Sequence, residues 1–173
     1  MSKILKIIVA FAISGAAALT ANAQMIERTS KGFLDPGITI PAGAETYYMS
    51  GKGNHAWGEG CMTRDERAAK GDECKPGDMY EQGKAVFAAF KTQLEEAGWS
   101  LSDVVMLRIY GVPGEDGKVD SAAFNKAYFE YFGEKSTSGN TNLPSRTFVG
   151  IHSLVVPGWL VEVEARAIRM PNK

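Results

Sequence analysis

The residue of this chain best suited to binding a substrate is Arg146, near the C-terminal end. It follows Leu143-Pro144-Ser145 and stands where a strand is expected to begin. A guanidinium that a proline-stiffened loop holds at the entry to a strand can take a carboxylate through two parallel hydrogen bonds. A structural ion pair between subunits is the alternative interpretation of the same residue.

Glu162 is the second candidate for chemistry. It lies in Leu160–Ile168, where apolar and charged residues alternate with the period of a half-buried strand. A carboxylate there can orient or deprotonate a water molecule, or it can belong to a solvated face. The β-branched residues of Thr147–Val155 predict a preceding strand, and Val156-Pro157-Gly158 supplies the break between the two.

The first 23 residues have the pattern of an export signal. Two lysines, Lys3 and Lys6, precede an apolar run over Ile7–Thr20, and Ala21-Asn22-Ala23 offers a cleavage site. The run is short for a membrane span. We therefore predict a signal peptide at 1–23, a single domain at 24–173, and a periplasmic or secreted protein with no membrane attachment. An uncleaved anchor is the alternative.

The charge of the mature chain disfavours nucleic acid as a partner. Without the two signal lysines, seventeen basic residues stand against 20 acidic ones, a net charge of −3. Phosphate binding needs a basic face, so we expect no nucleic-acid partner. A chain of this length can bury one hydrophobic core without the help of a metal.

The two cysteines, Cys61 and Cys74, are expected to form a disulfide, because an exported protein meets an oxidising compartment. They lie in a glycine-rich segment, about residues 52–77, that is predicted to be an insertion with one helical turn at Arg64–Lys70. A metal site with His55 is the alternative, but the spacing matches no compact zinc pattern. We expect neither a metal nor a cofactor.

The remaining elements are predicted from capping and periodicity. A capping box formed by Asp78 and Glu81 begins a helix that extends to about Ala97. Asp120 can cap a second helix over Ser121–Phe132. The expected strands outside the C-terminal pair are Glu45–Gly51 and Leu101–Val112.

The order of these elements favours an α+β fold. We find no repeated strand-helix alternation and no glycine-rich phosphate loop, so a dinucleotide-binding fold is disfavoured. The arrangement expected is one mixed sheet with two helices on one face. The other face is then free to meet a partner subunit.

Several motifs, taken in order, resemble those of the Rid family (RidA/YjgF, the reactive-intermediate deaminases). They are Tyr47-Tyr48-Met49-Ser50-Gly51, Leu94-Glu95-Glu96-Ala97-Gly98, Phe124–Phe132, Pro144-Ser145-Arg146-Thr147 and Leu160–Ala165. The resemblance implies a chorismate-mutase-like (YjgF-type) domain. It also implies a homotrimer in which the sheets of three subunits form a central barrel.

The resemblance further implies a hydrolase that deaminates 2-imino or enamino acids to 2-oxo acids and ammonia. Its substrate would be a small imine that carries a carboxylate, held by Arg146, with Glu162 positioning water. Ser50 and Gly51 match the strand end that lines the family's pocket, and Asn125 matches an asparagine near its rim.

Three departures from the family pattern keep other functions open. Thr29–Ile38 does not supply the N-terminal tyrosine that reaches the pocket in active deaminases, and the segment at 52–77 can roof the pocket. The predicted export also separates this protein from the cytoplasmic pyridoxal-phosphate enzymes whose reactive products the family usually clears. The alternative is a non-catalytic trimer that binds a small carboxylate or serves a periplasmic redox enzyme as an accessory protein. A ribonuclease is a third candidate, which the acidic mature chain disfavours.

Overall fold

The computed structural model describes residues 25–29, 32–54 and 57–171. The predicted signal at 1–23 and His55 lie outside these residues, so export and the histidine's role stay predictions. Within the described ranges, no helix combines the length and the apolar character that a bilayer span requires.

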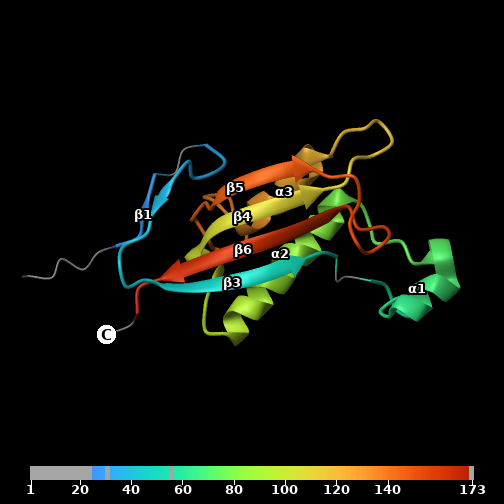
Figure 1. Cartoon of the computed structure of the whole chain (residues 1–173), viewed down its shortest axis with the longest axis horizontal. Coiled ribbons are helices and arrows are strands. Elements are labelled where there is room, and N and C mark those ends of the chain that lie inside the picture. Colours follow the sequence, from blue (N-terminus) through green and yellow to red (C-terminus); the bar gives the residue numbers. More distant parts are fainter. Residues whose placement is uncertain (1–24, 30–31, 55–56, 172–173) are drawn as a thin grey trace, which may run out of the picture.

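A mixed four-stranded sheet with helices on one face forms the body of the protein, as expected (Figure 1). In the order β3-β6-β4-β5, β6 is antiparallel to both neighbours, whereas β4 and β5 are parallel. A two-stranded ribbon, β1 and β2, precedes the sheet. The strands are β1 (Glu27–Arg28), β2 (Ile38–Thr39), β3 (Glu45–Lys52), β4 (Val104–Gly111), β5 (Ser145–Gly150) and β6 (Val161–Arg169).

Two capped helices, α2 (Met79–Glu96) and α3 (Ser121–Tyr131), cover one face of the sheet. The Asp78 carboxylate accepts a hydrogen bond from the backbone of Glu81, and the Glu81 side chain accepts one from the backbone of Asp78. Asp120 accepts from Ala123 N at the start of α3. Both predicted caps are confirmed, because these side chains satisfy donors that a helix start leaves unpaired.

The hydrophobic core lies between this helix pair and the sheet. On β6 the side chains of Val161, Val163 and Ala167 are fully buried and Ala165 nearly so. The intervening charged residues face the open side of the sheet, which confirms the alternation. The centre of the core is aromatic: Phe87 of α2 contacts Phe124, Tyr128 and Phe132.

The C-terminal pair of strands differs from the prediction. β5 covers Ser145–Gly150 and not Thr147–Val155, and its neighbour is β4, not β6. Because β4 lies between β5 and β6, the connection must pass the end of β4, which a short turn cannot do. Residues 151–160 make this crossing, and a backbone bond from Ile151 N to Gly111 O ends the ladder.

The segment after β3 forms a small lobe closed by the predicted disulfide, Cys61–Cys74. It holds α1 (Arg64–Lys70), as expected, and a 3₁₀ turn over Gly71–Glu73. Asn54 Nδ2 donates to Pro76 O at 2.7 Å and closes the lobe at its base. No group of metal-ligating side chains occurs among the described residues.

Gln82 ties α2 to the crossing before β6. Its side chain is fully buried, and Nε2 donates to Gly77 O and Gly158 O, each at 3.0 Å. Its Oε1 accepts from Leu160 N at 2.8 Å. Three backbone groups that would otherwise lack partners in the interior therefore depend on one amide.

We predict that Gln82→Leu lowers the free energy of unfolding by about 3 kcal/mol, because it leaves these three backbone groups unpaired. Gln93→Leu is the matched control: among the described residues Gln93 makes one hydrogen bond, from Nε2 to the Tyr47 hydroxyl, and its buried Oε1 has no partner. The control should lose at most about 1 kcal/mol. Urea denaturation measures both, and equal losses would contradict the role given to Gln82.

Candidate functional site

Arg146 lies on the helix-covered side of the sheet. It is the second residue of β5 and pairs with Leu107 of β4. Paired residues of neighbouring strands project from the same face, and Leu107 is fully buried beneath the helices. The arginine therefore points toward α3 and not toward the open face.

Three side chains surround the Arg146 guanidinium. Its Nη2 donates to Asn125 Oδ1 at 2.7 Å. The guanidinium carbon lies 4.4 Å from the ring centroid of Tyr128 and 5.0 Å from that of Phe33. Asn125 and Tyr128 are three residues apart on α3 and therefore share one face of the helix. The structure thus brings two predicted site residues, Arg146 and Asn125, into direct contact.

The guanidinium is poorly satisfied by the protein. Arg146 Nη1 is buried and has no hydrogen-bond partner among the described residues, and the same holds for the Tyr128 hydroxyl. Burial lowers the pKa of Arg146 and raises that of Tyr128. Within the described residues no carboxylate forms an ion pair with Arg146. A buried cation with an unpaired donor strongly favours an anion beside it.

The N-terminal segment is fastened next to Arg146. The Arg28 guanidinium donates to Leu143 O and Val104 O, at 3.0 and 3.1 Å. Asp35 is fully buried, and its backbone N–H donates to Pro144 O. These contacts fix the loop that precedes Arg146, and they place Phe33 over the guanidinium. The sequence holds no local signal for this contact, and Phe33 was not among the predicted site residues.

Ser50, Gly51 and Glu162 form a second group on the open face. Glu162 pairs with Tyr110 of β4, and the ladder between β3 and β6 shifts register between Met49 and Lys52, where Ser50 and Gly51 lie. A Cβ atom on Gly51 would stand 2.1 Å from Glu162 Oε1. The close approach of this carboxylate to the backbone therefore requires glycine.

The two groups do not meet within one chain. Arg146 and Glu162 lie on opposite faces of the sheet. Each is the second residue of its strand, and the two strands, β5 and β6, run in opposite directions. A single small molecule cannot contact both side chains of the same subunit. A site that uses both needs two copies of the chain.

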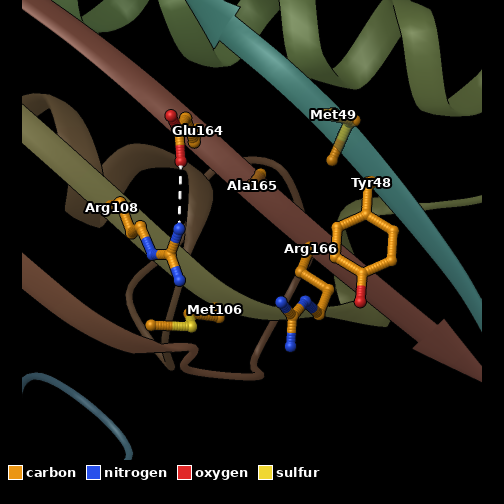
Figure 2. A pocket seen from close by; sticks show the side chains of 7 residues that line it. All are labelled: Tyr48, Met49, Met106, Arg108, Glu164, Ala165 and Arg166. Atoms are coloured by element: carbon orange, nitrogen blue, oxygen red, sulfur yellow. Dashed lines mark hydrogen bonds and ion pairs between the residues drawn. The ribbon is translucent and has the colours of Figure 1, made fainter.

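The open face carries a shallow hollow, shown in Figure 2, that contains none of the predicted site residues. Arg108 Nη1 lies 3.5 Å from Glu164 Oε2, and the Arg166 guanidinium carbon lies 4.5 Å from the ring centroid of Tyr48. The cavity volume is about 50 Å³, too small for a substrate. Tyr48 is nonetheless 67% exposed, which suits a surface that packs against another subunit.

Comparison with known sequences identifies relatives of most of this domain. Residues 48–169 match the family described as endoribonuclease L-PSP. A RutC family protein of Pyrococcus abyssi is 38% identical over 97 residues, which are 56% of this chain and 67% of the relative. A RutC family protein of Pyrococcus horikoshii is 34% identical over 100 residues, 58% of this chain and 70% of the relative.

Solved structures show the same α+β fold. A protein of the conserved Rid family from Yersinia pestis superposes with a TM-score of 0.56 at 24% identity and covers 78% of this chain and 86% of its own. A protein of unknown function from Pseudomonas aeruginosa gives a TM-score of 0.53 at 26% identity, over 83% of this chain and 92% of its own. The predicted YjgF-type α+β fold is thereby confirmed.

The contact between Asn125 and Arg146 yields a stability test. We predict that Asn125→Asp raises the free energy of unfolding by about 1 kcal/mol, because a carboxylate would accept from the buried guanidinium. The ion pair would lower the pKa of the new aspartate. The gain should therefore be complete above pH of about 4, the value in the unfolded chain, and be lost as pH falls through the lower folded-state pKa.

Denaturation of Asn125→Asp, Asn125→Ala and the parent at pH 7 and at pH 3 checks this. Asn125→Ala should be destabilised at both pH values because it removes the acceptor of Nη2. An aspartate variant less stable than the parent at pH 7 would show that Arg146 is already paired.

Proposed function

This chain belongs to the Rid family, described as endoribonuclease L-PSP, and from that premise we propose that it is an exported hydrolase of small imines. Its substrates would be 2-imino or enamino acids, and its products carbonyl compounds and ammonia. An imine carbon is electrophilic, especially when its nitrogen is protonated. The protein then needs to hold the substrate and direct one water molecule, which is mainly a task of positioning.

The observation that carries this proposal is that Arg146 Nη1 is buried and has no hydrogen-bond partner within the part of the chain that the structure describes. Asn125 fixes the orientation of the guanidinium through Nη2, which leaves Nη1 for a ligand. A carboxylate is the anion that matches this geometry, and the imino acids proposed as substrates carry one. Burial strengthens the attraction, because water screens the charge less in the interior.

Glu162 would orient or deprotonate the attacking water, with Ser50 and Gly51 forming the wall of the site. These residues lie on the face of the sheet opposite to Arg146. In the proposal, Glu162 of one subunit therefore acts on a substrate that Arg146 of another subunit holds. Gly51 supports this role, because a larger residue would displace the Glu162 carboxylate.

We propose a homotrimer in which the open face of each sheet lines a central barrel. The exposed Tyr48, the pair of Arg108 and Glu164, and Arg166 would lie at this interface (Figure 2). Export to the periplasm or beyond would bring the protein to imines formed outside the cytoplasm by oxidation of amines or amino acids. The Cys61–Cys74 disulfide is consistent with that environment.

A non-catalytic carboxylate-binding or accessory role is the second candidate. Phe33, one of two aromatic residues that the structure describes beside the Arg146 guanidinium, has no hydroxyl with which to move a proton. The Tyr128 hydroxyl is buried, and its raised pKa keeps it protonated. These features suit a protein that binds an anion and catalyses no reaction as well as they suit an enzyme. A ribonuclease remains third, since the mature chain carries an excess of acidic residues.

We predict that the purified protein accelerates imine hydrolysis and that Arg146→Ala lowers the rate about 100-fold, because the substrate loses its anchor. An amino-acid oxidase would generate 2-imino acids from a panel of amino acids, and semicarbazide would trap the imine that survives. Glu162→Gln should lower the rate about 100-fold as well, since the amide cannot accept the proton of water.

Lys91→Ala is the matched control, because it removes one exposed charge on α2, remote from both groups. It should behave as the parent does. If the parent leaves trapping unchanged but binds 2-oxo acids in an Arg146-dependent way, the binding role replaces the catalytic one. If it neither hydrolyses nor binds, both proposals fail.

The trimer is tested separately by light scattering. We predict a trimeric mass for the parent and a monomeric mass for Arg108→Glu, because the reversed charge faces Glu164 on a surface that would be buried between subunits. Lys91→Glu, which reverses an exposed pair with Glu95 on α2, should stay trimeric. A monomeric parent would contradict the proposal.

A further inference from the structure

The lobe after β3 and the crossing before β6 enclose a groove between them. Figure 1 shows α1 standing beyond the end of the sheet, beside the loop that follows β5. The cavity volume is about 610 Å³, within the range of small-molecule sites. Its lining residues come from both segments and include none of the residues proposed for imine hydrolysis.

Most of this lining is apolar. Val155, Val156 and Pro157 form one wall, and Ala68 and Cys74 lie on the lobe opposite. Val155 is 96% exposed, the largest exposed fraction among the large hydrophobic residues of the described chain. An apolar ligand that covered this wall would remove the valine side chain from water, which is a favourable transfer.

Two arginines add positive charge to the groove. Arg64 and Arg67 are three residues apart on α1 and share one face of that helix. The Arg67 guanidinium lies 4.5 Å from the ring centroid of Trp57, and its Nη1 donates to Cys61 O and Met62 O. Within the described residues neither arginine forms an ion pair with a carboxylate.

We propose that this groove binds a small amphipathic carboxylate, a molecule with an apolar body and one anionic end. The body would lie against Val155 and the ring of Trp57, and Arg64 would hold the carboxylate, with Arg67 fixed beside it. A multiply charged anion such as a nucleotide fits less well, because apolar side chains make up most of the wall. The site is separate from Arg146 and does not depend on imine hydrolysis.

The disulfide belongs to this site. Cys74 lines the groove, and its bond to Cys61 holds the start of the lobe, where Arg67 is anchored, against the lobe's end. Reduction would free the part of the lobe that carries Cys61 from the part that carries Cys74. Binding should therefore be strongest in the oxidised protein and lost in the reduced one.

Calorimetric titration of the purified, oxidised protein with 3-phenylpropanoate and hexanoate tests the proposal. Both carboxylates should bind, and 3-phenylpropan-1-ol, which has the same body without the charge, should bind at least about tenfold more weakly. Sulfate should not compete. The titrations are repeated in Arg146→Ala, where a carboxylate that still binds cannot be held by the proposed active site.

Arg64→Gln should weaken carboxylate binding about fivefold, since it removes the charge nearest to solvent. This variant keeps the Thr63–Glu66 capping box, so α1 should still form. Val155→Ser, on the opposite wall and almost fully exposed, should weaken binding without disturbing the lobe. Lys91→Gln should have no effect.

Equal binding of the alcohol and the carboxylate would overturn the proposal, because the arginines would then contribute nothing. So would unchanged affinity in both Arg64→Gln and Val155→Ser, or displacement by sulfate, which would indicate a site for inorganic anions. Absence of binding by every probe in the oxidised protein would also exclude it, and a peptide or protein segment would become the candidate occupant.

Discussion

The register of β6 between β3 and β4 is the constraint on which the rest of this structure depends. Side chains alternate between the faces of a strand, so a shift by one residue would exchange the buried valines and alanines of β6 for its charged residues. The same register sends Glu162 to the open face. Through Leu107 of β4 it also sends Arg146 to the face that the helices cover. The same register thus both forms the core and separates the two candidate site residues, Arg146 and Glu162.

In the proposed mechanism, that separation makes the assembly of two copies of the chain a condition for catalysis. A buried guanidinium whose Nη1 has no hydrogen-bond partner among the described residues is costly to the isolated subunit, and a bound anion would offset this cost. A carboxylate on the other face of the sheet cannot reach the same ligand. A chain built in this way gains a complete site when copies combine, so the energetics of binding and those of association become linked.

Local patterns predicted much of the fold because its elements are locally encoded. The alternation of β6 and the capping box of α2 placed these elements to within about a residue. The length of β5 was overestimated, because the end of a strand depends on its partner strand. The parallel pairing of β5 with β4 is not predicted by any pattern in the neighbouring residues. Among the site residues, Tyr128 could have been found from its i+3 relation to Asn125. Phe33 could not, since more than a hundred residues separate it from Arg146 and the contact depends on the bonds of Arg28 and Asp35.

The lobe at 52–77 joins the domain through two adjacent ends. The Asn54 side chain donates a hydrogen bond to the Pro76 carbonyl, and α1 contributes no buried side chain to the core. Segments inserted between close, fixed ends impose little strain on the domain that carries them. This position can therefore change in length and composition over evolution at little expense to folding, and an engineer could exchange the lobe for another loop there. Diversity of ligand range within such a scaffold would arise at its periphery while the sheet stays unchanged.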